Sequence, residues 1–234
     1  MIVIILIILI IFICKHIYEL HNINYENNLY HIQNDNKEDI NEKLRYRNPI
    51  IFHNLGNKIE LIKKINISYL MNENPGYIIK DNSKLISLES FNKDKMNIYK
   101  NEYMSKDLNL TLLFDKIYES FNSKIHCNKK YYLTLLKGLN GISLKKNKHN
   151  LHLIYQISGI NNIYIFNPKF KDNIINKNND IIKKWGIKIK LTPGLVILIP
   201  TEWYYIYETE SDESIIGEIE SDNYFTVLYN LLRE

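Results

Sequence analysis

The chain has 234 residues, of which 45% are hydrophobic, and a formal net charge of +4. This length and apolar content predict one globular domain with a substantial core. The two cysteines, Cys14 and Cys127, are far apart in the sequence and exclude a disulfide framework and a CxxC metal site. Acidic and basic residues are interspersed without an arginine-rich stripe, so we expect no nucleic-acid partner.

The N-terminus is an unbroken apolar run from Met1 to Cys14, MIVIILIILIIFIC, which Lys15 ends. At about 1.5 Å per residue the run covers about 21 Å, whereas the hydrocarbon of a bilayer is roughly 30 Å thick. Local thinning of the bilayer, or snorkelling of Lys15, would close this gap. We therefore expect residues 1–20 to form an uncleaved, single-pass membrane anchor that contacts lipid from Met1 to Tyr18.

Two other interpretations of this run are open. A cleaved signal peptide fits its length, but no basic segment precedes it and no small-x-small cleavage site follows it. A buried strand is disfavoured because a polar stretch follows directly. Lys15 weakly favours a cytosolic side for the folded part. Residues 21–46, rich in Asn, Asp, Glu and Lys, are expected to form a polar linker, and residues 47–234 the folded domain.

From Asn48 onward, short β-branched and aromatic runs alternate with Asn, Gly and Pro. Expected strands are 50–52, 77–80, 151–157, 162–166, 187–191, 195–199, 204–207 and 214–219. Expected helices are 57–65, 108–121 and 224–232. Many short strands after a mixed opening predict a barrel or sandwich with helices packed outside it.

A series of short motifs follows in a fixed order along the domain. They are Asn48-Pro49-Ile50-Ile51-Phe52, Ile67 to Leu70 followed by Tyr77 to Ile79, Tyr103 with Lys106-Asp107, Gln156-Ile157-Ser158-Gly159, Ile163 to Phe166 followed by Pro168, Pro193-Gly194 to Ile199-Pro200, and Trp203-Tyr204-Tyr205. In this order the motifs resemble the cupin-like JmjC family of hydroxylase- and demethylase-related proteins.

The resemblance implies a mainly β fold with flanking α-helices, a double-stranded β-helix or jelly-roll barrel, here preceded by the N-terminal hydrophobic helix. It places segments 151–157, 163–166, 195–199 and 204–207 in one antiparallel barrel or double sheet. The helices between residues 57 and 121 are expected outside that barrel.

Members of this family bind Fe(II) through a His-x-Asp/Glu pair on one strand and a second His on a later strand, which leaves room for 2-oxoglutarate and O2. The resemblance aligns Lys146 and Lys148 with the first two ligand positions and Tyr205 with the third. Between Leu139 and Gln156 the chain has no Asp or Glu in any register. We therefore predict no catalytic, cofactor-binding or metal-binding residue, and no cofactor.

The cosubstrate position also departs from the family, because Asn161 stands where many members have the lysine that pairs with 2-oxoglutarate. His149 or His152 reaches a ligand position only if loop lengths shift, and both are expected on the surface or in the barrel wall. The carboxylates of Glu202, Glu208 and Glu210 are expected in solvent near the rim. Residues 203–205 are expected to pack in the core and rim rather than form a substrate cage.

These departures predict a membrane-anchored, catalytically inactive barrel that acts as a binding or structural module, with a protein as a further candidate partner. The alternative is a divergent Fe(II)/2-oxoglutarate-dependent protein hydroxylase with a site built from unexpected residues. A cluster of His149 or His152 with a carboxylate inside the barrel would favour the alternative. Packed side chains around residues 146–152 and Tyr205 would favour the inactive module.

Overall fold

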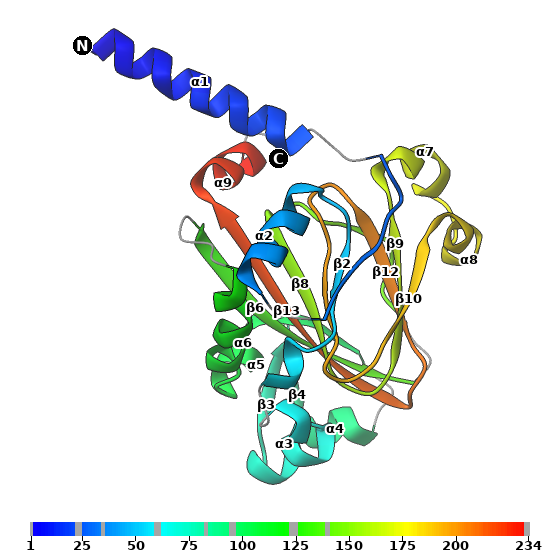
Figure 1. Cartoon of the computed structure of the whole chain (residues 1–234). Coiled ribbons are helices and arrows are strands. Elements are labelled where there is room, and N and C mark those ends of the chain that lie inside the picture. The colour runs from blue at the N-terminus through cyan, green and yellow to red at the C-terminus, as the bar shows by residue number, and fades with distance from the viewer. Residues whose placement is uncertain are drawn as a thin grey trace.

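The computed structural model describes residues 2–21, 25–33, 36–58, 62–81, 84–93, 97–121, 126–138 and 141–231. In these ranges the fold is mainly β, with two large sheets, a small hairpin and helices around them (Figure 1). The predicted fold class is confirmed at this level. Two of the expected helices, 57–65 and 224–232, extend into residues outside the described ranges.

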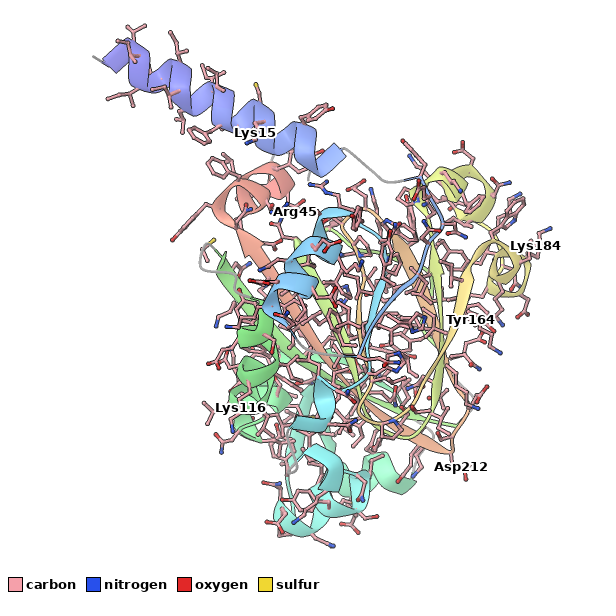
Figure 2. All side chains as sticks on the ribbon, in the orientation of Figure 1. Lys15, Arg45, Lys116, Tyr164, Lys184 and Asp212 are labelled. Carbon is pink, nitrogen blue, oxygen red and sulfur yellow. The ribbon has the colours of Figure 1, made fainter. Side chains whose placement is uncertain are left out.

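The N-terminal helix α1 (Ile2–His21) projects away from the rest of the molecule (Figure 1). Its apolar side chains are exposed, from Val3 at 68% to Phe12 at 58%, and point outward on all sides in Figure 2. No helix in the described part of the chain is long and apolar enough to cross a membrane. The expected membrane-spanning anchor is therefore not found among the described residues.

The polar stretch after α1 is folded where it is described. Strand β1 (Tyr30–Ile32) pairs in parallel with β2 (Ile50–Phe52). Helix α2 (Lys37–Arg45) begins at Asn36, whose side chain accepts a hydrogen bond from the Glu38 amide, and carries acidic residues in its first turn and basic residues in its last. The segment expected as a linker thus adds a strand and a helix to the domain.

A layer of helices covers one face of the large sheet. It contains α3 (Ile67–Glu73), α4 (Leu88–Lys93), α5 (Glu102–Asp107), α6 (Thr111–Tyr118), 3-10 turns at Gly56–Lys58, Ile62–Lys64 and Glu119–Phe121, and the hairpin β3 (Ile78–Asp81) and β4 (Lys84–Ser87). Their apolar residues join those of the sheet in the largest hydrophobic cluster. In place of the expected helix at 57–65 there are two 3-10 turns, with residues 59–61 outside the described ranges.

The large sheet has the order β1-β2-β11-β8-β13-β6-β5. Its further strands are β5 (Ile98–Asn101), β6 (His126–Lys137), β8 (Leu151–Ser158), β11 (Val196–Leu198) and β13 (Glu213–Asn223), which is followed by helix α9 (Tyr224–Leu231). The two longest strands, β6 and β13, lie side by side and antiparallel.

The second sheet has the order β10-β9-β12-β7. Its strands are β7 (Lys145–Lys146), β9 (Asn161–Phe166), β10 (Ile187–Leu191) and β12 (Tyr204–Thr209). A small hydrophobic cluster on its outer face joins it to α7 (Lys171–Ile174), α8 (Asn179–Ile182) and Trp185.

Eight strands pair in a nested order, in which the first strand pairs with the last, the second with the second-last, and so on. Strand β6 pairs with β13, β7 with β12, β8 with β11, and β9 with β10, all antiparallel. Eight strands paired in this way over two sheets form a jelly roll. The sheets are separate rather than closed into one barrel, so the double-sheet form of the expectation is the observed one, and "barrel" below means these two facing sheets.

A second hydrophobic cluster fills the space between the sheets and takes residues from both, among them Ile154 and Ile216 from the large sheet and Ile163 and Tyr205 from the small one. Successive residues of a strand face opposite sides. Because Ile216 faces the interior, Glu218 and Glu220 on the same strand face it as well. Next to the apolar cluster, the interior therefore also contains buried polar side chains.

Candidate functional site

The interior polar group is built on two neighbouring strands. His152 lies on β8 directly opposite Glu220 on β13. The His152 Nε2 atom is 3.1 Å from Glu218 Oε2, and the His152 and Glu218 side chains are almost fully buried. We call His152, Glu218 and Glu220 the interior cluster.

Lys100 brings a positive charge to this cluster from strand β5. Its ammonium lies 3.3 Å from Glu218 Oε2 and also forms an ion pair with Glu220. A third acceptor is the hydroxyl of Tyr205. The backbone of Lys100 has a φ of 45°, rare for a residue with a side chain, and its amide donates to Thr134 Oγ1 at 3.0 Å.

Burial and ion pairing together decide which of these groups are charged and which are neutral. Burial alone lowers the pKa of Lys100, but the Glu218 and Glu220 carboxylates outweigh it and raise that pKa above its usual range. Burial likewise tends to raise the pKa of both carboxyls, but Lys100 and His152 lower the pKa of Glu218, and His149, His152 and Lys100 lower that of Glu220. Burial dominates for His152 and lowers its pKa, so its imidazole is neutral at pH 7.

His149 forms a second ionic contact at the edge of the cluster. Its Nδ1 is 2.7 Å from Asp222 Oδ2 and its Nε2 is 3.1 Å from Glu220 Oε2. Burial lowers the pKa of His149, but hydrogen bonds to Asp222 and Glu220 outweigh this and raise it to about 9. His149 is therefore an imidazolium at neutral pH, held between two carboxylates of strand β13.

Hydroxyl groups complete the surroundings of Glu218. Thr134 Oγ1 donates to Glu218 Oε1 at 3.2 Å, and the Tyr207 hydroxyl lies 3.4 Å from the same atom. Tyr205 packs its ring edge against His152, with 5.2 Å between centroids. Burial, and then the Glu218 charge, raise the pKa of both tyrosines, so they stay protonated.

A pocket of about 270 Å³ opens beside this group and is bordered by Lys100. Its other lining residues are Tyr99, Gly141, Ile142, Ser143, Lys145 and Tyr207. The Tyr99 hydroxyl donates to the Gly141 carbonyl at 3.0 Å and so joins two parts of the wall. We call this the mouth pocket, because it connects the exterior with the end of the barrel at which Lys100 lies.

Comparisons with known proteins give matches in structure only: no family model and no curated protein matches the sequence. Solved structures similar to the chain include the cupin domain of Schizosaccharomyces pombe Cnp3, with 11% identity and a TM-score of 0.33 over 45% of this chain and 58% of that domain. A mutant of Bacillus subtilis oxalate decarboxylase OxdC has 15% identity and a TM-score of 0.32 over 41% of this chain and 22% of that one.

A cupin superfamily protein from Desulfitobacterium hafniense has 13% identity and a TM-score of 0.30 over 41% of this chain and 68% of that one. Similarity at this level carries no argument about ligand or activity. The fold is cupin-like because its eight core strands pair as in a jelly roll.

The residues at the family's iron positions do not meet at one point. Lys146 is paired with Glu202 at 2.5 Å and lies over the ring of Tyr204, which belongs to the cluster on the outer face of the small sheet. Lys148 is exposed, and its carbonyl accepts a hydrogen bond from Asn230. Only Tyr205 faces the interior.

Asn161, at the family's cosubstrate position, has a structural role. Its Nδ2 donates to Gln156 Oε1 at 2.7 Å and to Ser214 Oγ at 2.6 Å. The Gln156 amide in turn donates to the carbonyls of Ser158 and Gly159. This network ties the β8–β9 turn to β13, so the position is engaged in holding the fold.

The family's iron therefore does not fit the positions that the resemblance indicated. Ammonium groups repel a divalent cation, and the Tyr205 hydroxyl remains protonated. The carboxylates expected in solvent near the rim form ion pairs: Glu202 with Lys146, Glu208 with Lys183, and Glu210 with Lys190. Glu210 is exposed, and Glu202 and Glu208 are partly exposed.

The interior cluster itself was missed in the sequence. His149 and His152 had been singled out, but Glu218 and Glu220 had not, nor had Lys100. One signal was available: Glu218, Glu220 and Asp222 alternate from within the expected strand 214–219 to just beyond its end, which places three acidic side chains on one face if the strand continues. Charges in that pattern, in a strand otherwise rich in isoleucine, indicate a buried or functional face.

Proposed function

We propose that this chain is a JmjC-like cupin that has lost iron and 2-oxoglutarate chemistry and acts as a binding module. The observation that carries the proposal is the placement of the residues aligned with the iron ligands. Lys146 is paired with Glu202 and packed against Tyr204, whereas Tyr205 faces the interior. Such residues offer no set of converging ligands for a metal ion.

One observation favours the alternative, a divergent oxygenase. His152 lies with Glu218 and Glu220 inside the barrel, which is the kind of cluster that such an enzyme would need. The Lys100 ammonium, however, is bonded among these carboxylates. A lysine held protonated in this position competes directly with a metal ion, so we favour the inactive module.

The mouth pocket is the proposed binding site. Tyr99, Ile142 and Tyr207 give it an apolar wall, and Lys145 gives it an ammonium for which the described residues provide no ion-pair partner. Binding pockets commonly combine an apolar lining with a few polar groups that orient the ligand. We propose a small organic anion with an apolar body as the ligand.

We further propose that α1 attaches the module to a membrane by burying its exposed apolar turns in lipid. An exposed run of isoleucine and leucine is costly in water, at roughly 1.5 to 3 kcal/mol per side chain. The apolar residues surround the helix on all sides (Figure 2), which suits lipid better than a groove on a protein.

The loss of oxygenase chemistry is tested by anaerobic reconstitution of the full chain with Fe(II), followed by addition of O2 and 2-oxoglutarate. Release of succinate is the readout, with a known 2-oxoglutarate oxygenase as positive control. We expect no succinate above the protein-free rate. Turnover that depends on Glu218 or Glu220 would establish the divergent oxygenase instead.

Binding at the mouth is tested by thermal unfolding with benzoate as the probe. We expect the midpoint temperature to rise with benzoate concentration in the wild type and not in Lys145→Glu, which reverses the charge at the pocket. Lys84→Glu, at an exposed position of the hairpin, is the matched control and should respond like the wild type. An equal response of all three proteins would remove the mouth pocket from the proposal.

A further inference from the structure

The interior cluster has the composition of a metal site. One ligand atom each from His152, Glu218 and Glu220 lie within 4.8 Å of one another, and all three residues are buried. Zn²⁺ takes such nitrogen and oxygen ligands at about 2.0–2.2 Å, which places ligand atoms roughly 4 Å apart or less. A small contraction of the cluster would therefore suffice to surround one ion.

The cluster also differs in place from the family's iron site. Its residues lie on β8 and β13, whereas Lys146 and Tyr205, aligned with the family's ligands, lie on β7 and β12. It is thus a separate group of side chains that share the barrel interior.

The ammonium of Lys100 lies between the carboxylates of Glu218 and Glu220. An ammonium has three N–H donors, and three oxygen acceptors surround this one: Glu218, Glu220 and the hydroxyl of Tyr205. Among the described residues Lys100 is the charged partner of Glu218, whereas Glu220 also contacts the His149 imidazolium, and a buried carboxylate without a cation has a large cost in free energy. Lys100 therefore meets the need for positive charge that a metal ion would otherwise meet.

His152 supports the same conclusion. In a metal-bound histidine, the N–H of the second ring nitrogen almost always donates a hydrogen bond to a carboxylate or carbonyl. The Nδ1 atom of His152 is buried and has no hydrogen-bond partner among the described residues. The ring thus contacts Glu218 through Nε2 but lacks the hydrogen bond at Nδ1 that orients a histidine in a dedicated metal site.

We infer that Lys100 is the resident cation of this barrel, that its ammonium replaces a divalent metal ion between Glu218 and Glu220, and that its removal opens a divalent-cation site on His152, Glu218 and Glu220. This inference does not depend on the ligand of the mouth pocket. It is also separable from the oxygenase assay, because it concerns which cation the cluster holds rather than turnover.

The test is titration calorimetry of the full chain with Mn²⁺ and with Zn²⁺. Lys100→Met keeps most of the length of the side chain and removes the charge, whereas Lys100→Arg keeps a cation in place. We expect one site in Lys100→Met, with an affinity at least about 100-fold above that of the wild type and of Lys100→Arg. The double variant Lys100→Met with Glu218→Gln should lose this site. A folded Lys100→Met that binds no better than the wild type, or a wild type that binds as tightly, would overturn the inference.

A second readout applies if Lys100→Met is poorly folded. A ligand that binds only the folded state raises the unfolding temperature. Millimolar Mn²⁺ should therefore stabilise Lys100→Met and Lys100→Gln but leave the wild type unchanged. The absence of a metal-dependent increase in both variants would count against the inference as firmly as the calorimetry.

Discussion

The ammonium of Lys100 forms an ion pair with the carboxylate of Glu220, 120 positions later in the chain. The pair joins β5, at the edge of the large sheet, to β13, the third strand from that edge, and lies inside the barrel. Strand β5, which lies outside the eight strands of the jelly roll, is thereby linked to them by a charge contact as well as by its pairing with β6.

Loss of this contact is expected to destabilise the fold. Lys100→Met leaves Glu218 buried without its cation and Glu220 with only His149 as a charged partner, and removal of one partner of a buried pair typically costs about 3–5 kcal/mol. Urea unfolding without added metal measures this cost. Lys84→Met, at an exposed position in the hairpin, should change stability by less than about 0.5 kcal/mol. Equal stability of the two variants would mean that Lys100 has no such role.

His149 predicts a loss of stability at alkaline pH. Its pKa is raised from 6.5 to about 9, so its contribution is complete below about pH 6.5 and lost as the pH rises through 9. The shift corresponds to at most about 3 kcal/mol, reduced because the side chain is partly exposed. Urea unfolding at pH 6.5, 8 and 9.5 tests this, and His149→Gln should remove most of the decline. A wild type with the same stability across that range would refute the assignment.

Gly159 is expected to tolerate no side chain. Its φ is +74°, and a Cβ there would lie 2.3 Å from the Glu213 carbonyl oxygen and 2.8 Å from the Cα of Ser214. Gly76 has a similar φ of +80° but open space around it, so Gly76→Ala reports backbone strain alone. We expect about 1 kcal/mol of destabilisation for Gly76→Ala and at least about 3 kcal/mol for Gly159→Ala. Equal unfolding temperatures of the two variants would show that the β8–β9 turn shifts to accommodate the added Cβ.

Restoring a single family ligand should not restore iron chemistry. Tyr205→His introduces an imidazole, but Lys146 and Lys148 still occupy the other aligned positions and the Lys100 charge remains nearby. We expect neither stoichiometric Fe(II) binding nor succinate release from this variant. Activity in Tyr205→His would mean that the interior cluster can supply the missing ligands.

If α1 attaches the chain to a membrane, the full chain and a chain without α1 should behave differently in the presence of lipid vesicles. The full chain should float with phosphatidylcholine vesicles in a density gradient, and the chain lacking residues 1–18 should remain at the bottom. Replacement of Ile7 and Ile8 by aspartate in the full chain is the matched control, since it keeps the length but introduces charge into lipid. Flotation of the truncated chain would indicate that another surface binds the membrane.

Much of the jelly roll could be predicted from local pattern. Strands such as 50–52 and 187–191 are short β-branched runs with clear punctuation, and they appear with the expected bounds. Strand β6 could not be predicted in this way, because its start, His126–Lys130, is polar and its character as a strand comes from its partner β13. The two 3-10 turns near residue 60 likewise differ from the helix that the local pattern predicts.

The candidate site was predictable only in part. Absence of the family's ligands could be read directly at Lys146, Lys148 and Tyr205, since it required only the identities of residues. The interior cluster required pairing information: Lys100 meets Glu220 only after β5 and β13 are placed on either side of β6. Contacts of such sequence separation leave no local signal, which is why the sequence does not predict the place of Lys100 in the cluster.

If Lys100 stands in the barrel interior in place of a metal ion, the purified full chain should bind no metal there. This is measured as metal content by mass spectrometry, after anaerobic incubation with Fe(II), Mn²⁺ or Zn²⁺ and removal of unbound ions. We expect far less than one ion per chain for the wild type. One tightly held ion per chain, lost in Glu218→Gln and kept in Lys145→Met, would contradict this expectation.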